Sequence, residues 1–122
     1  PFPSFADIDN SDVVIYALFY RPFRPRGVLD FTGGEAGKVH WSMMYGAEKA
    51  IVVSFGSPYF GEQYYERAQT YVNAYSMTAC SVEAFARAAI GEIPFTDFSP
   101  VHLTTYEEEI APRKNVTLPF RD

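Results

Sequence analysis

The stretch AIVVSFGSPY at residues 50–59 is the part of this sequence that decides the fold. Ala50 to Phe55 read as a buried strand, apolar on consecutive residues rather than on alternate ones. That pattern is typical of a parallel sheet covered by helices on both faces. Ligands of such sheets bind beyond the carboxyl ends of the strands. We therefore expect any function of this chain to lie at the turn that follows, Gly56–Tyr59.

Similar segments flank this stretch. Residues 13–20 (VVIYALFY) predict a first strand, apolar throughout and buried on both faces, and residues 70–75 (TYVNAY) predict a third. A helix is predicted between the first two strands, from Glu35 to Lys49, and a short one near Glu62–Ala68. The longer helix has an inward stripe at every fourth residue, widened by aromatic and Met side chains: Val39, Met43 and Ala47, with Trp41, Met44 and Tyr45.

The last helix has the clearest boundaries. Thr78 is a suitable N-cap, and Gly91 suits the left-handed residue that ends a helix. Cys80, in the first turn, is expected to be buried and inert. The apolar residues predict one buried face: Val82, Phe85, Ala86, Ala89 and Ile90.

Strands and helices thus alternate along the chain, which is the signature of βαβ units. The predicted fold is α/β, a three-layer arrangement of βαβ units with a small, mainly parallel sheet. Because three strands are few for such a sheet and a first strand buried on both faces needs neighbours on each edge, the chain reads as part of a domain. We place that domain at residues 1–106, with an N-terminal loop at Pro1–Asn10 and an edge strand at Val101–Leu103. An acidic, Pro-containing tail follows at 107–122.

Composition excludes several classes of function. A net charge of −5 without a basic run argues against nucleic-acid binding. No apolar run approaches the roughly 20 residues of a membrane span. One cysteine and two separated histidines form no metal-ligand cluster, so neither a metal nor another cofactor is expected. Aromatic residues make up 17% of the chain, and such residues fill cores or line interfaces.

Two segments partly match known catalytic motifs, but each lacks residues that its motif requires. Residues 32–39 (TGGEAGKV) lack the first Gly and the final hydroxyl of a phosphate-binding loop, so they favour a flexible start to a helix. Ser57 lacks the second flanking Gly of a nucleophile elbow, and neither His40 nor His102 is linked to it by sequence. The alternative interpretation of the turn is structural. Gly56 would permit a tight turn out of the strand, Pro58 would fix the backbone of that turn, and the Tyr59 ring would pack against the protein. Ser57 remains a candidate for hydrogen bonding to a ligand.

One basic feature lies on the presumed ligand side. Residues 21–26 (RPFRPR) form a Pro-stiffened loop at the carboxyl end of the first strand. Arginine forks can hold a carboxylate or a carbonyl-rich ligand, and they can equally form salt bridges to another domain. The candidate ligand-binding residues are therefore Arg21, Arg24, Ser57 and Tyr59, and no catalytic residue is assigned. The acidic residues at 62, 66, 97 and 107–109 are interpreted as surface or turn-capping groups.

Several segments, in order, resemble the C-terminal α/β domain of glycoside hydrolase family three. The resemblance covers Val13 to about Leu103 and is nearest to the bacterial β-N-acetylhexosaminidase branch. It rests on DVVIYA, VVSFGSPY, YVNAYS and SVEA, together with the GEI that ends the last helix: residues 12–17, 52–59, 71–76, 81–84 and 91–93.

The resemblance implies that this chain packs on an N-terminal (β/α)8 barrel, which carries the family's catalytic aspartate. No segment here matches the Lys-His-Phe-Pro-Gly neighbourhood of that barrel. The implied role is scaffold within a retaining β-glycosidase acting on terminal β-linked sugars, with the chain inactive alone. The alternative is a free-standing α/β domain that binds a ligand or partner, and self-association through exposed apolar surface is a further expectation. Nothing in the sequence fixes the compartment.

Overall fold

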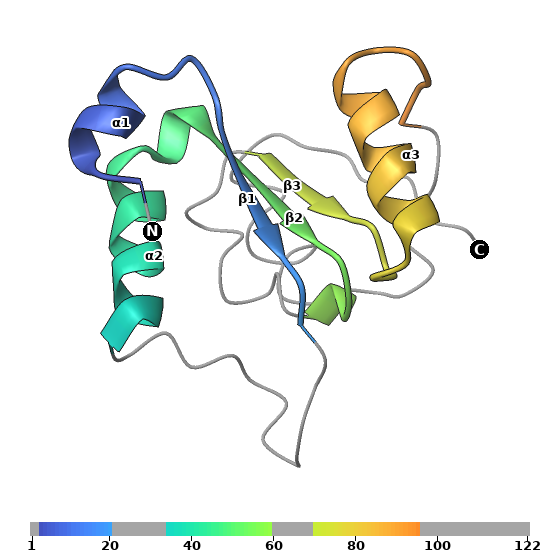
Figure 1. Ribbon diagram of the computed structural model, residues 1–122, viewed down its shortest axis with the longest axis horizontal. Coiled ribbons are helices and arrows are strands. Elements are labelled where there is room, and N and C mark those ends of the chain that lie inside the picture. Colours follow the sequence, from blue (N-terminus) through green and yellow to red (C-terminus); the bar gives the residue numbers. More distant parts are fainter. Residues whose placement is uncertain (1–2, 21–33, 60–69, 96–122) are drawn as a thin grey trace, which may run out of the picture.

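The computed structural model describes residues 3–20, 34–59 and 70–95, coloured along the chain in Figure 1. Helices cover both faces of a small sheet, which confirms the predicted α/β class. The elements follow in the order α1 (Phe5–Asp9), β1 (Val14–Leu18), α2 (Gly34–Tyr45), the 3-10 helix η1 (Ala47–Lys49), β2 (Ala50–Ser54), β3 (Thr70–Asn73) and α3 (Ala79–Ala89).

The sheet is parallel throughout the described residues, with the order β1-β2-β3. Its register pairs Val14 with Ala50 and Ile51 with Thr70. The three predicted strands are confirmed, although each is shorter than expected and β2 ends at Ser54 rather than Phe55. β2 lies between two neighbours, and its residues are buried except for Ile51, which is half-buried. Val52 and Val53 are almost completely enclosed.

One face of the sheet packs on α2. Tyr16, Met43, Ala50 and Val52 form the buried cluster between them. The Tyr16 hydroxyl donates to Ser42 Oγ at 3.3 Å, which satisfies a phenol inside this apolar layer. Val39 and Met43 face the sheet as predicted. The predicted widening of the stripe is wrong, because the side chains on either side of it are exposed: Trp41, Met44 and Tyr45.

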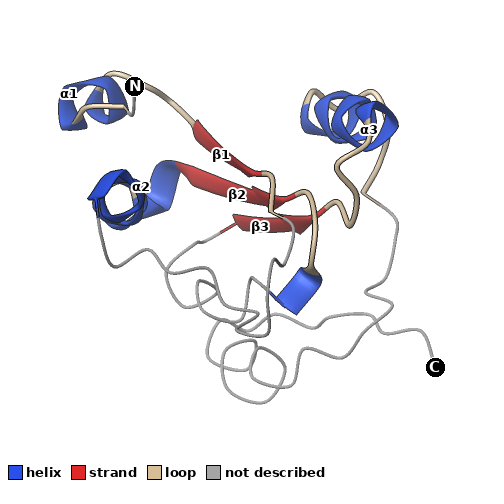
Figure 2. Ribbon diagram, turned by 60° about the horizontal axis from the view of Figure 1, so that its bottom comes forward, coloured by secondary structure: helices blue, strands red, loops and turns tan. Residues whose placement is uncertain are grey.

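The opposite face packs on α3. Side chains alternate along a strand. Because Val52 points to α2, Val53 and Phe55 point to the face that α3 covers. The Phe55 ring stacks on Phe19, with centroids 4.7 Å apart, and meets Phe85 of α3 edge-on at 5.9 Å. Figure 2 shows α2 and α3 on opposite sides of the strands. This arrangement confirms the predicted three layers.

Helix α3 begins and ends as predicted, but its buried face is narrower. Thr78 accepts a hydrogen bond from the Ser81 N–H, and Gly91 has φ +82°. Ala88 is buried and Phe85 half-buried, whereas most of the predicted apolar face is exposed: Val82, Ala86, Ala89 and Ile90. The prediction of a buried Cys80 is also wrong. Its thiol is exposed, because α3 meets the sheet along a single stripe that Cys80 does not share.

The predicted N-terminal loop is wrong where it covers α1. Ser4 caps this helix in a capping box with Asp7: Ser4 N–H donates to the Asp7 carboxylate at 2.8 Å, and Asp7 N–H donates back to Ser4 Oγ. Ile8 is 1% exposed and lies against Gly46, where the chain leaves α2. Lys49 Nζ then donates to the Ile8 and Asp9 carbonyl oxygens. Tertiary packing therefore holds a helix too short to be stable alone.

Three predicted features lie outside the described residues: the helix near Glu62–Ala68, the edge strand at Val101–Leu103 and the tail at 107–122. Across the parts of the chain that are described, no helix is both long enough and apolar enough to cross a membrane.

Candidate functional site

The candidate site is the edge of the sheet where the carboxyl ends of its three parallel strands meet. Backbone hydrogen bonds hold these ends together beyond the strands themselves. Phe55 N–H donates to the Leu18 carbonyl oxygen at 2.9 Å, and Ala74 N–H donates to the Ser54 carbonyl oxygen at 2.8 Å. The carboxyl ends of the three strands therefore meet at one edge, as the sequence predicted.

The turn after β2 approaches the end of β1 very closely. A Cβ atom placed on Gly56 would collide with the Tyr20 carbonyl oxygen. Only glycine allows the two backbone segments to lie this near each other. The interpretation of Gly56 as a tight exit from the strand is thus confirmed, and the cause is contact with the neighbouring strand.

Of the four predicted site residues, two lie in the described part of the turn. Ser57 is half-buried, and its carbonyl oxygen accepts a hydrogen bond from Ser54 Oγ at 3.2 Å. Tyr59 is 53% exposed, so the alternative that it packs is wrong. Arg21 and Arg24 lie outside the described residues.

The sequence did not indicate the polar residues of β2 and β3 that lie next to this turn. Ser54 is 1% exposed, and it lies on β2 beside β3, the strand that carries Tyr71. Asn73 pairs with Ser54 in the register of the two strands. We call Ser54, Ser57, Tyr71, Asn73 and Tyr75 the carboxyl-end cluster. Tyr71 and Asn73 are two residues apart, so their side chains lie on one face of β3. That spacing, next to a strand that contains Ser54, is the sequence signal that could have indicated the cluster.

Tyr71 has the strongest pKa shift in the described structure. Burial raises the pKa of its phenol to about 12, although the neighbouring Ser54 side chain opposes the effect. The hydroxyl oxygen is enclosed, so ionisation would place a charge where water cannot solvate it. Tyr71 is therefore a neutral hydrogen-bonding group at any physiological pH.

This shift predicts an alkaline loss of stability. The folded pKa lies above the ordinary value of 10.0, so the contribution of neutral Tyr71 is complete below pH 10 and is lost as the pH rises towards about 12. The loss is about 2–3 kcal/mol across that window. The measurement is the difference in unfolding free energy between pH 9 and pH 11.5, from urea denaturation at each pH. We expect Tyr71→Phe to remove most of this difference. The matched Tyr59→Phe variant should retain it, and an equal drop in both variants would contradict the assignment.

Backbone strain marks the end of β3. Tyr75 has φ +58°, the left-handed region that bulky side chains rarely adopt. Such residues persist where the surrounding structure holds them, and they cluster at functional sites. The strain also explains why β3 ends at Asn73, two residues earlier than predicted.

The described groups at this edge do not form a catalytic centre of a familiar kind. The carboxyl-end cluster offers hydroxyl and amide groups, with neither a carboxylate nor an imidazole. His40 lies on α2 with its ring edge-on to Trp41, and His102 lies outside the described residues. Residues 3–20, 34–59 and 70–95 hold no group of three His, Cys, Asp or Glu side chains that could bind a metal ion. This arrangement can bind hydroxyl-rich groups or order the adjoining loops.

Comparison with protein-family models, with curated proteins and with solved structures gives no match in any of the three.

Proposed function

We propose that this chain is a non-catalytic α/β accessory unit that packs against the catalytic unit of a β-glycosidase. The observation that supports it is a row of alternating residues on the outer face of β1, namely Val13, Ile15, Ala17 and Phe19. We call it the outer row. Val13 is 52%, Ile15 50% and Phe19 56% exposed, although the sequence reads as a strand buried on both faces.

That prediction for β1 is wrong within the described structure, and the reason is specific. Among the described residues β1 has a neighbour on one edge only, and the outer row points away from α2. Exposed apolar side chains in a contiguous row are typical of a surface that another protein unit covers. An accessory unit would bury the outer row on its partner.

The glycosidase assignment rests on the resemblance to glycoside hydrolase family three. The segments that carry this resemblance fall on β1, β2 and its turn, β3 and α3 of this chain. The partner in this proposal is an N-terminal (β/α)8 barrel or an equivalent protein surface. The whole protein would hydrolyse terminal β-linked sugars, with N-acetylglucosamine as the first substrate to test.

The chemistry of the carboxyl-end cluster supports a scaffold role. Retaining glycosidases use two carboxyl groups about 5–5.5 Å apart, one as nucleophile and one as acid and base. The cluster contains neither. The catalytic pair would come from the partner unit, and the cluster would shape or border its cleft.

Dye binding tests the packing part of this proposal. We expect the 122-residue chain alone to bind a hydrophobic dye, and Ile15→Lys to reduce the dye fluorescence at least about twofold by interrupting the outer row. Ala84→Lys introduces the same charge at an exposed position on α3 and should leave the signal unchanged. A dye-silent chain with a cooperative melt would contradict the proposal.

An activity comparison tests the glycosidase part. The native gene product purified from its source cells should hydrolyse an aryl N-acetylglucosaminide or another aryl β-glycoside, whereas the 122-residue chain alone should not. Activity in neither, over a panel of aryl β-glycosides, would contradict the glycosidase assignment.

The strained backbone at Tyr75 favours a second candidate, a ligand-binding domain that uses the loops at residues 21–26 and 56–59. This candidate predicts saturable binding by the monomeric chain, weakened by Ser57→Ala or Arg24→Ala. Unchanged affinity in both variants would rule out that site.

A further inference from the structure

Helix α1 holds the junction between α2 and η1 through one apolar contact. Ile8 is 1% exposed, and a Cβ atom placed on Gly46 would collide with its side chain. Gly46 is the residue at which the chain passes from α2 into η1. Phe5 also stacks on Tyr45, with ring centroids 4.4 Å apart, but both rings are about half exposed. Ile8 is the one buried residue of α1, so a single side chain carries the apolar part of this attachment.

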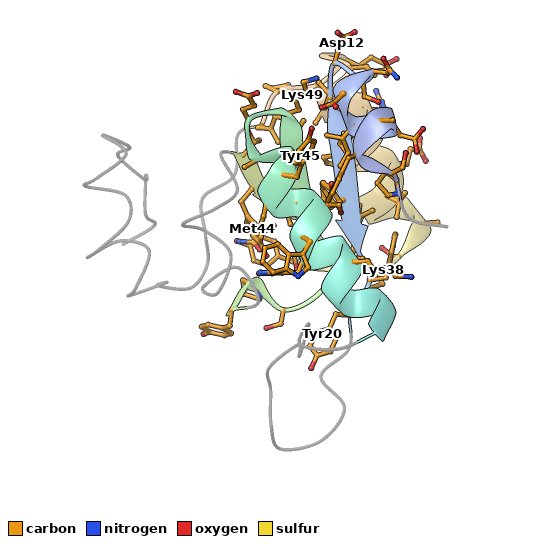
Figure 3. The ribbon with its side chains drawn as sticks, turned by 90° about the vertical axis from the view of Figure 1, so that its left-hand side faces the viewer. Asp12, Tyr20, Lys38, Met44, Tyr45 and Lys49 are labelled. Carbon is orange, nitrogen blue, oxygen red and sulfur yellow. The ribbon has the colours of Figure 1, made fainter. Side chains whose placement is uncertain are left out.

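Polar contacts complete the attachment at the carboxyl end of α1. The Tyr45 hydroxyl donates to both carboxylate oxygens of Asp9, each at 3.1 Å. Lys49 Nζ donates to the Ile8 and Asp9 carbonyl oxygens at 3.3 and 3.0 Å, where a positive charge favours the helix. Figure 3 shows Tyr45 and Lys49 near one end of α2, with Lys38 near the other. Because hydrogen bonds to a charged acceptor are about twice as strong as neutral ones, protonation of Asp9 would weaken this attachment.

A second carboxylate holds the amino end of α1. The Asp7 carboxylate accepts from the Ser4 hydroxyl at 2.7 Å and from Ser4 N–H at 2.8 Å. These hydrogen bonds, that of the hydroxyl above all, keep the pKa of Asp7 below its ordinary value of 3.8. The contribution of ionised Asp7 to the folded helix is therefore complete well above pH 3.8, and it is lost as the pH falls through the lowered pKa.

Other titratable groups near α1 do not change this acid response. The hydrogen bond to Asp9, together with the negative charge of that residue, raises the pKa of Tyr45, so the phenol stays neutral throughout the acid range. Glu48 of η1 and Asp12, which follows α1, carry the same charge as Asp9 and cannot replace Tyr45 as a donor. His40 lies on α2 five residues before Tyr45, more than one helical turn away. Acid therefore acts on α1 through its two carboxylates.

The sheet depends on contacts that acid does not remove. The buried cluster between the sheet and α2 is apolar apart from the hydroxyl pair of Tyr16 and Ser42, which carries no charge in acid. On α3, the ion pair of Arg87 with Glu92 is exposed, and exposed pairs contribute little to stability. Falling pH should therefore weaken α1 before it weakens the sheet.

We propose that α1 is a pH-sensitive strap, residues 4–10, that opens in acid while the sheet stays folded. Protonation of Asp7 and Asp9 removes the charge from both ends of the strap, and a five-residue helix does not persist without its tertiary contacts. Opening would expose Ile8 and the junction around Gly46. It would also free the amino end of β1, which residues 10–13 join to α1. This property belongs to the chain itself and does not depend on the accessory function.

Residue-resolved amide hydrogen exchange of the 122-residue chain, from pH 6 to pH 2.5, tests the proposal. Protection is the exchange rate of an unstructured peptide at the same pH divided by the measured rate. The Ile8 and Asn10 amides report on the strap, and the Phe55 and Ala74 amides report on the sheet. We expect strap protection to fall at least about tenfold at a pH where sheet protection is unchanged.

Three results would overturn the proposal. Strap amides that are unprotected at pH 6 would show that α1 is not closed there. Constant strap protection down to pH 2.5 would show that acid does not open it. Loss of protection by strap and sheet at the same pH would show that acid unfolds the chain as a whole.

A double variant separates the two carboxylates from every other effect of acid. Asp7→Asn with Asp9→Asn keeps an oxygen that can accept each hydrogen bond but cannot gain or lose charge. Its strap protection should be lower than normal at pH 6 and should show no further fall in acid. Asp12→Asn removes the same charge from an exposed aspartate outside the strap, so its response should match that of the unaltered chain. An acid-dependent fall in the double variant as large as in the unaltered chain would contradict the role of the two carboxylates.

A milder variant tests the Tyr45 contact should the double variant open fully at pH 6. Tyr45→Phe keeps the ring that stacks on Phe5 and removes the hydroxyl that donates to Asp9. We expect strap protection at pH 6 to fall severalfold, with protection at Phe55 and Ala74 unchanged. Unchanged strap protection in this variant would contradict the proposed attachment.

Discussion

Phe55→Ala is expected to reduce the unfolding free energy by about 4 kcal/mol, the largest effect that we expect from a substitution among the described residues. Phe55 is 1% exposed and lies between Phe19 and Phe85, so its ring joins the end of β1 to α3. Truncation loses the buried ring and leaves a cavity at the point where two layers meet. For a small domain with a total stability of about 5–15 kcal/mol, that loss removes much of the folded population.

Urea denaturation followed by circular dichroism measures this effect. Phe95→Ala serves as the matched control, because Phe95 is 63% exposed and its removal should change stability by less than about 0.5 kcal/mol. If the two variants unfolded at the same urea concentration, the packing of α3 against this face of the sheet would be wrong.

Gly56→Ala should have the next largest effect, about 3 kcal/mol of destabilisation. The new methyl group meets the Tyr20 carbonyl oxygen, which belongs to backbone and cannot rotate away. The two strand ends must separate, and the backbone hydrogen bond from Phe55 to Leu18 lies directly beside them.

Ser57→Ala is the control for this substitution. It changes the adjacent residue, and the hydrogen bond from Ser54 ends on the Ser57 backbone carbonyl rather than on its hydroxyl. We expect a change below about 1 kcal/mol. A Gly56→Ala variant as stable as Ser57→Ala would contradict the close approach of the two backbones.

The central part of the fold was predictable because its signals are local and strong. Consecutive apolar residues fixed β2, and Thr78 with Gly91 fixed the ends of α3. Helix α1 was missed although Ser4 and Asp7 have the spacing of a capping box, because Asp replaces the usual Glu or Gln. Its stability comes from Ile8 against Gly46, a contact between residues far apart in the sequence.

The burial of side chains was less predictable than the elements. An apolar sequence shows that a side chain favours burial, but it does not show what covers it. The same kind of sequence gives a buried Val53 on β2 and a half-exposed Ile15 on β1, since only β2 has a neighbour on each edge of the described sheet. On α3, the apolar residues exceed what one stripe of contact can bury, so Ile90 and Cys80 are exposed.

The arrangement of the strand ends was predicted, and the side chains that lie there were predicted only in part. The rule for parallel sheets gave the edge, and Gly56 gave the turn. Ser54 and Tyr71 were missed because each is an ordinary strand residue whose polar group matters only once β2 and β3 pair. The positive φ of Tyr75 has no sequence signal, since a glycine would be the usual residue there.

The central claim is that this chain works as one unit of a larger protein assembly, and the native mass of the gene product tests it most directly. An antibody raised against residues 79–95 would detect the protein in its source cells. We expect a product several times heavier than the 13.8 kDa of this chain, with β-glycosidase activity in the same fraction. A product near 13.8 kDa that migrates as a monomer would contradict the accessory function and leave the free-standing binding domain as the better account.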